Sequence, residues 1–114
     1  NGEVCHVDHF FPHMLKQFNF KNVDLVWNLV LTCSDCNNGK SGKFDLLPDK
    51  KYLSELFKRN NFFIESNLPI RESIMKQTGS TSSERKSFLE NFDQNALSIQ
   101  PHRWKPMILR GKPI

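Results

Sequence analysis

The stretch that most constrains the fold is residues 26–32, Val-Trp-Asn-Leu-Val-Leu-Thr, which is rich in β-branched and aromatic side chains. This composition favours a β-strand. Residues 3–9 alternate loosely around Val4 and Val7 and predict an earlier strand, which Pro12 closes. We expect the two strands to pair as an antiparallel ribbon.

The segment between these strands, residues 13–26, has an irregular polar and aromatic pattern. It predicts a long loop with about one helical turn, and long loops in small domains are often functional. After the second strand, Thr32 or Ser34 can cap a short helix over residues 34–42, which two glycines keep short or irregular. The expected order is therefore strand, loop, strand and helix.

Amphipathic helices are predicted for most of the remaining chain. Residues 49–65 place apolar side chains on one face, residues 68–77 predict a second helix that ends at Gly79, and Thr81 and Glu84 have the spacing of a capping box that starts a third. We therefore expect an α+β fold, in which a two-stranded ribbon and a helix are followed by an α-helical part. The expected regions are 1–47 for the ribbon core, 48–96 for a helical extension that packs on it, and 97–114 for an extended basic tail.

Composition narrows the class of protein. The 114 residues are 38% hydrophobic and 25% charged, which excludes a disordered polyampholyte and a membrane protein. The first residues lack the features of a secretory signal, so we expect an intracellular, cytoplasmic protein. The chain does not begin with Met and its chemical motifs start within the first ten residues, so we expect it to be part of a longer protein with other domains. Composition leaves the oligomeric state open.

The net charge of +4 comes entirely from the tail. This segment contains no acidic residue, and a basic segment of this kind would suit a polyanion. Its basic residues are Arg103, Lys105, Arg110 and Lys112.

The densest chemical signal is the pair Asp8 and His9 at the end of the first strand. A twist there can aim both side chains at one phosphate. Asn37 adds a neutral oxygen ligand from the following helix, and one carboxylate, one amide oxygen and several waters suit Mg²⁺, or Mn²⁺ in its place. A neutral imidazole can deprotonate the water that attacks a phosphodiester, so His9 suits the role of general base.

Three motifs in this order resemble the HNH nucleases, which have a ββα-metal fold. They are Val-Asp-His-Phe-Phe-Pro at 7–12, Trp-Asn-Leu-Val-Leu at 27–31 and Cys-Ser-Asp-Cys-Asn-Asn-Gly-Lys at 33–40, and the resemblance covers residues 4 to about 43. It implies a metal-dependent DNA endonuclease domain with His9 as general base. We expect its substrate to be double-stranded DNA. By position it assigns the metal to Asp8 and Asn37 and makes Asn28 the residue that braces the fold.

The same resemblance puts Lys40 one turn beyond Asn37, where it would face substrate phosphate, and Lys43 is a second candidate for DNA contact. For both lysines the alternative is a solvated helix end. His6 and His13 could touch phosphate or simply cover the ribbon and the loop, and we leave both out of the catalytic set.

The cysteines make a structural zinc ion a further candidate. Cys33 and Cys36 form a C-x-x-C pair, but a common version of the HNH pattern has a second such pair upstream, and here only Cys5 is present. The remaining ligands would have to come from Cys5, from His6, from a further segment or from another chain. The alternative function is therefore a non-catalytic, zinc-stabilised nucleic-acid-binding module.

Overall fold

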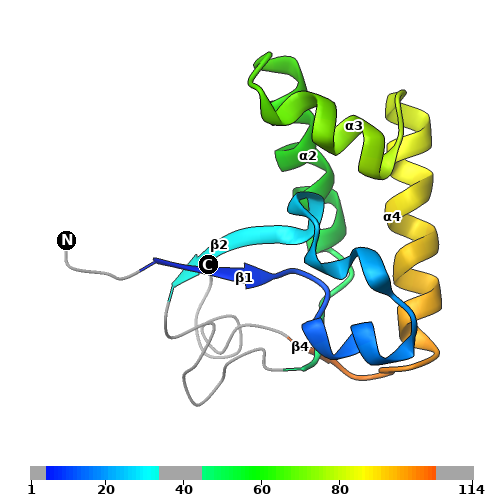
Figure 1. Cartoon of the computed structure of the whole chain (residues 1–114). Helices are drawn as coiled ribbons and strands as arrows, with labels where there is room; N and C mark the ends of the chain where they lie inside the picture. The colour runs from blue at the N-terminus through cyan, green and yellow to red at the C-terminus, as the bar shows by residue number, and fades with distance from the viewer. Residues whose placement is uncertain (1–4, 34–44, 105–114) are drawn as a thin grey trace.

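A two-stranded antiparallel ribbon projects from one side of a block of helices (Figure 1). The structure is a computed structural model of the chain, and it describes residues 5–33 and 45–104. Strand β1 (Cys5–His9) pairs with β2 (Leu29–Cys33) in a register that places Cys5 opposite Cys33 and His9 opposite Leu29. The predicted ribbon is confirmed.

The second strand starts three residues later than the sequence predicts. Residues Val26–Asn28 form a short 3-10 helix, η3, and the backbone N–H of Asn28 donates to the carbonyl of Leu25 instead of joining a strand ladder. The Trp27 side chain, which lies in this 3-10 turn, is fully buried in the core. Tertiary packing therefore overrides local β-propensity here.

The loop between the strands contains more helical structure than the one turn expected. Two further 3-10 helices, η1 (His13–Phe18) and η2 (Lys21–Asp24), precede η3. Asn19 ends η1 in the left-handed region with a φ of 75°, a conformation that asparagine tolerates better than most residues. Leu15 and Val23 are fully buried, so the loop is held by its own apolar anchors.

Three α-helices follow, close to the predicted ranges: α2 (Tyr52–Glu65), α3 (Ile70–Thr78) and α4 (Ser82–Leu97). The predicted capping box is present, since the Thr81 hydroxyl accepts from the Glu84 N–H and the Glu84 carboxylate accepts from the Thr81 N–H, both at 3.1 Å. Gly79 follows α3 with a φ of 142°, and a Cβ there would lie 2.7 Å from the Cβ of Glu84. Glycine is therefore needed at this turn.

The loop and the helices share one hydrophobic core. Phe11 and Trp27 have no exposed surface, and Phe92 of α4 packs against both rings at centroid distances of 4.7 and 5.0 Å. Such large aromatic contacts tie the end of the ribbon to the helical block. The buried cluster comprises Phe10, Phe11, Leu15, Val23, Trp27, Leu47, Leu53, Leu56, Leu89, Phe92 and Ala96.

A short parallel bridge, which the sequence does not predict, joins β3 (Leu47–Pro48) to β4 (Arg103–Trp104). Arg103 donates to the carbonyl of Pro48 at 2.9 Å and to the buried carboxylate of Asp93 at 2.8 Å. The first basic residue of the predicted tail is thus bound to the fold, and its charge is paired with Asp93.

The observed architecture is a small mixed α+β domain with an antiparallel ribbon and helices, as predicted at this level. The predicted helix at 34–42 and most of the tail lie outside the described residues. In the described part of the chain, no helix is long and apolar enough to cross a bilayer.

Candidate functional site

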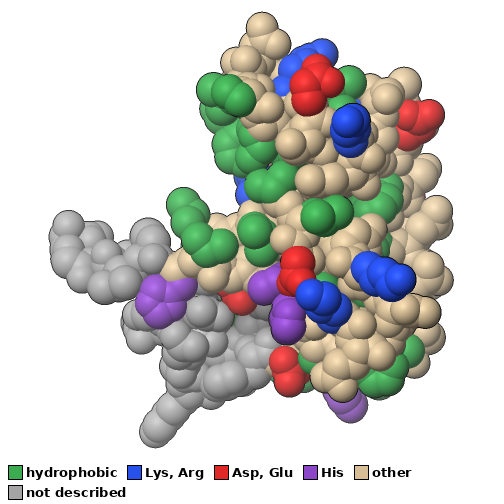
Figure 2. Space-filling view, viewed as in Figure 1, with side chains coloured by type: hydrophobic (Ala, Val, Ile, Leu, Met, Phe, Trp, Pro, Cys, Tyr) green, Lys and Arg blue, Asp and Glu red, His purple; other side chains and the backbone are tan. Residues whose placement is uncertain are grey.

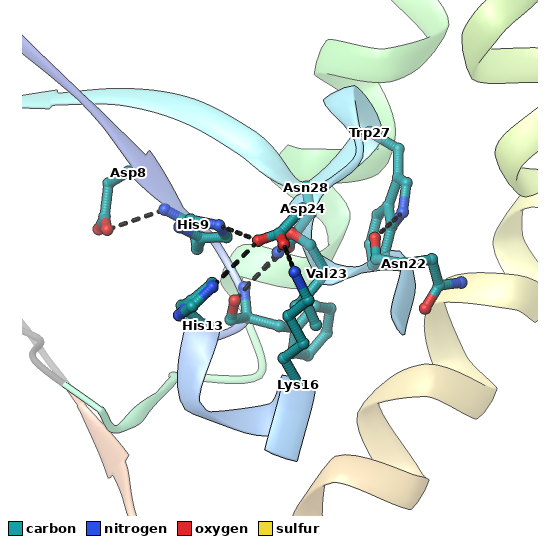
Figure 3. Close-up of polar contacts among 10 residues, drawn as sticks. Asp8, His9, His13, Lys16, Asn22, Val23, Asp24, Trp27 and Asn28 are labelled. Carbon is teal, nitrogen blue, oxygen red and sulfur yellow. Dashed lines mark hydrogen bonds and ion pairs between the residues drawn. The ribbon is translucent and has the colours of Figure 1, made fainter. Parts of the chain in front are cut away.

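Asn28 is the structural centre of the site. Its side chain is fully buried, and its amide oxygen accepts from the Phe11 N–H at 2.8 Å while its amide nitrogen donates to the carbonyls of Phe11 at 2.9 Å and Val23 at 2.8 Å. Its own carbonyl accepts from the Phe10 N–H at 2.7 Å. A single amide therefore joins the end of β1 to the loop and to the start of β2 (Figure 3).

The helices hold the backbone around Asn28. Arg59 of α2 donates to the carbonyls of Leu29 at 2.6 Å and Trp27 at 2.9 Å, and Gln77 of α3 accepts from the Trp27 N–H at 3.1 Å. Burial lowers the pKa of the Arg59 guanidinium from its ordinary value, yet arginine remains charged under all ordinary conditions. The fixed fork of its donors suits two neighbouring carbonyls.

His9 is the last residue of β1, directly before the segment that Asn28 holds. Its Nε2 lies 2.9 Å from Oδ1 of Asp24, at the end of η2, and its side chain is 27% exposed. In Figure 3 the imidazole is turned toward Asp24. The strand end and the loop therefore fix both the position and the orientation of this ring.

Asp24 is the second hydrogen-bonding centre, and it lies at the surface. Lys16 donates to its Oδ2 at 2.7 Å, and His13 Nε2 lies 3.4 Å from its Oδ1. The hydrogen bond from Lys16, followed by that from His9, lowers the pKa of the Asp24 carboxyl from 3.8 to about 2. Asp24 is therefore a carboxylate throughout the physiological range. Figure 2 shows histidine, carboxylate and lysine side chains gathered on this face.

His9, His13 and Asp24 also form a group that could hold a metal ion. One ligand atom from each lies within 4.8 Å of the others, and the rings of His9 and His13 have centroids 5.1 Å apart. The three side chains come from separate segments, β1, η1 and η2.

Asp8 lies beside this group but is not one of its members. Its carboxylate Oδ1 accepts from the backbone N–H of His9 at 2.8 Å, and the side chain is half-buried. This bond holds the Asp8 carboxylate against the backbone of His9. Figure 3 shows the Asp8 carboxylate and the His9 ring extending in different directions from the same strand end.

The remaining predicted site residues are placed only in part. Cys5 and Cys33 are direct cross-strand partners in the ribbon. Asn37, Cys36, Lys40 and Lys43 lie outside the described residues.

Asp24 and Lys16 were missed by sequence reasoning, and His13 was left outside the catalytic set. The available signal was the polar content of a long loop directly after the Asp-His pair. That signal indicates a functional segment but does not indicate which of its side chains turns back toward His9.

Comparisons of the chain with models of protein families, with curated proteins and with solved structures returned no match.

Proposed function

We propose that this chain is a metal-dependent DNA endonuclease domain of the HNH, ββα-metal kind, with His9 as general base and a divalent cation held by Asp8 and Asn37. The observation that carries the proposal is the pairing of two features at one strand end. The Asn28 amide fixes the backbone that follows His9, and the Asp24 carboxylate fixes the His9 ring. A histidine that only fills space needs neither of these supports.

The Asp24 contact favours one tautomer of His9. A carboxylate accepts a hydrogen bond, so His9 would carry its proton on Nε2 and the lone pair on Nδ1. The nitrogen that takes the proton from water is then Nδ1. A carboxylate behind an imidazole also stabilises the imidazolium that forms when the proton arrives, as in other base and carboxylate pairs.

Asp8 supplies an oxygen ligand one residue from the base. Mg²⁺ or Mn²⁺, when bound, would neutralise charge on the pentacoordinate phosphorus and on the leaving oxygen. Asp8 and Asn37 would hold it, and His9 would deprotonate the attacking water beside it. The distance between ligand and base is limited by the backbone, because the Asp8 carboxylate is bonded to the His9 N–H.

Structural zinc forms a further part of the proposal. Cys5 and Cys33 are register partners, and Cys36 completes the C-x-x-C pair two residues beyond Ser34. Cysteine thiolates are preferred ligands of structural Zn²⁺, so this pair and the C-x-x-C motif supply the chemistry that such an ion needs. In a nuclease such an ion would stabilise the ribbon and the following segment without taking part in hydrolysis.

The test is nicking of supercoiled plasmid by the purified chain in Mg²⁺, Mn²⁺ or EDTA. We expect cleavage that EDTA abolishes, and a loss of roughly 10²–10⁴-fold in the His9→Ala variant, the range typical of a general base. Asp8→Asn should raise the Mg²⁺ concentration needed for half the maximal rate. The matched control is His102→Ala, because His102 is an exposed histidine of the β3–β4 region, outside the site.

Equal rates for His9→Ala and the unaltered chain would overturn the mechanism. Retention of DNA without any metal-dependent cleavage would favour the zinc-stabilised binding module instead.

A further inference from the structure

The histidine and aspartate group beside the proposed catalytic site has the composition of a transition-metal site. It offers two imidazole nitrogens and one carboxylate oxygen, from His9, His13 and Asp24. Imidazole suits Zn²⁺, Ni²⁺ and Co²⁺, whereas Mg²⁺ prefers oxygen ligands and keeps several waters. This group therefore differs in metal preference from the oxygen site proposed at Asp8 and Asn37.

The spacing of the ligand atoms fits one small ion. With metal–ligand bonds of about 2.0–2.1 Å, tetrahedral ligands lie roughly 3.3 Å apart. Asp24 Oδ1 lies 2.9 Å from His9 Nε2 and 3.4 Å from His13 Nε2, and all three atoms lie within 4.8 Å of one another. Both separations from Asp24 Oδ1 are therefore close to the distance between two ligands of one ion.

Lys16 prepares the carboxylate for binding through one oxygen. Its ammonium group holds Oδ2 at 2.7 Å, so Oδ1 is the atom that faces both histidines. Hydrogen bonds to the outer atom of a ligating carboxylate commonly orient it. The side chains of His13 and Asp24 are 61% and 36% exposed, so solvent can supply the remaining ligands of the ion.

We propose that His9, His13 and Asp24 bind a single Zn²⁺, Ni²⁺ or Co²⁺ ion through Nε2, Nε2 and Oδ1, and that this ion inhibits the nuclease. The inhibitory half rests on the proposed function of His9. Binding of a metal to Nε2 requires that the ring proton sit on Nδ1. The lone pair that would take a proton from water is then gone, and Asp24 no longer supports the base.

Two consequences follow for the reaction. Millimolar Mg²⁺ does not displace zinc from imidazole ligands, so inhibition should persist in the reaction buffer. A chelator that removes zinc but leaves Mg²⁺ in place should restore nicking.

The test uses the full chain, with its zinc content measured as purified, and titrates it with Zn²⁺ while recording NMR spectra of the histidine rings. We expect the His9 and His13 rings to respond together and to saturate at one equivalent beyond the zinc that the cysteines hold, while His102 stays unchanged. His13→Ala and Asp24→Asn should each weaken zinc binding by at least about tenfold, since loss of even an outer-shell partner commonly costs that much. His102→Ala is the matched control and should bind zinc as the unaltered chain does.

Co²⁺ distinguishes this site from the cysteines. A thiolate site gives an intense sulfur-to-cobalt charge-transfer band, whereas ions bound by His9, His13 and Asp24 give only weak ligand-field bands. The proposal requires ligand-field bands that appear without a matching rise in the charge-transfer band, and requires that His13→Ala remove them.

The same titration is then followed by plasmid nicking in Mg²⁺, where inhibition should have the midpoint measured for binding. The metal site would be overturned, even if the chain nicks DNA, by either of two results. One is that the NMR signals of the His9 and His13 rings do not change with zinc, and the other is equal zinc affinity in His13→Ala and His102→Ala. Zinc binding at these rings in a chain that never nicks DNA would overturn the nuclease and the inhibition, and would leave the metal site standing.

Discussion

Asn28 and Asp24 lie in the same loop and both help to place His9, but they do so in opposite environments. Asn28 is fully buried, and its amide is bonded to backbone groups of Phe11 and Val23. Asp24 is 36% exposed and bonded to the ionisable side chains of His9 and Lys16. A buried amide has no water to replace a lost partner, whereas an exposed carboxylate does. The first residue should therefore control folding, and the second should control the chemistry of the ring.

The largest effect is expected from Asn28→Ala. The substitution leaves the Phe11 N–H and the carbonyls of Phe11 and Val23 without their partner inside the core. At about 1–3 kcal/mol for each buried unsatisfied group, the loss of unfolding free energy should be roughly 3 kcal/mol or more. Urea unfolding followed by circular dichroism measures it.

The matched control is Asn95→Ala, because Asn95 is an exposed asparagine of α4. Alanine favours a helix, so this variant should unfold within about 0.5 kcal/mol of the unaltered chain. Similar losses for the two variants would contradict the assignment of Asn28 as the brace.

A smaller effect of a different kind is expected from Asp24→Asn. The amide keeps the shape of the carboxylate but removes the charge that orients and stabilises the His9 ring. Nicking should fall by about 10–100-fold, the usual cost of losing an outer-shell partner, while the urea midpoint should fall much less than in Asn28→Ala because Asp24 is exposed. A loss of stability in Asp24→Asn as large as that in Asn28→Ala would show that Asp24 also controls folding.

The smallest effect is expected from Lys16→Met, which removes the main cause of the lowered Asp24 pKa. The carboxyl of Asp24 should titrate near 2 in the unaltered chain and closer to 3.8 in the variant, as carbon NMR of the carboxyl group would show. Because the folded-state pKa is depressed, any stability that Asp24 contributes is present above its ordinary pKa and is lost as the pH falls through about 2. An unchanged pKa in Lys16→Met would remove Lys16 from the site.

Much of the fold follows from local patterns. The ribbon, the three helices and the capping box at Thr81 and Glu84 were all predictable, because strand alternation, helical periodicity and caps depend on residues a few positions apart. The strand at residues 26–32 was placed too early, since burial of Trp27 and the bonds around Asn28 convert its first turn into η3.

The site was predictable only where a motif marked it. Asp8, His9 and Asn28 belong to recognisable motifs, and the buried amide of Asn28 has the bracing geometry expected for it. Asp24 and Lys16 carry no motif, because they reach His9 through the three-dimensional path of the loop. Arg59 is a further case, since a lysine- and arginine-bearing helix face usually meets solvent, yet this side chain turns inward to the carbonyls of Trp27 and Leu29.

The sequence by itself determined the two ribbon strands to within a few residues, the three α-helices, where α4 begins, and which residue types are available for metal and proton chemistry. Only the tertiary structure decided which of those residues meet: Asp24 with His9, Arg59 with the backbone at the start of β2, and Arg103 with Asp93. The physical reason is the range of the interactions. Caps and periodicity act within a few residues, whereas these contacts join segments that come together when a common core around Phe11, Trp27 and Phe92 is buried.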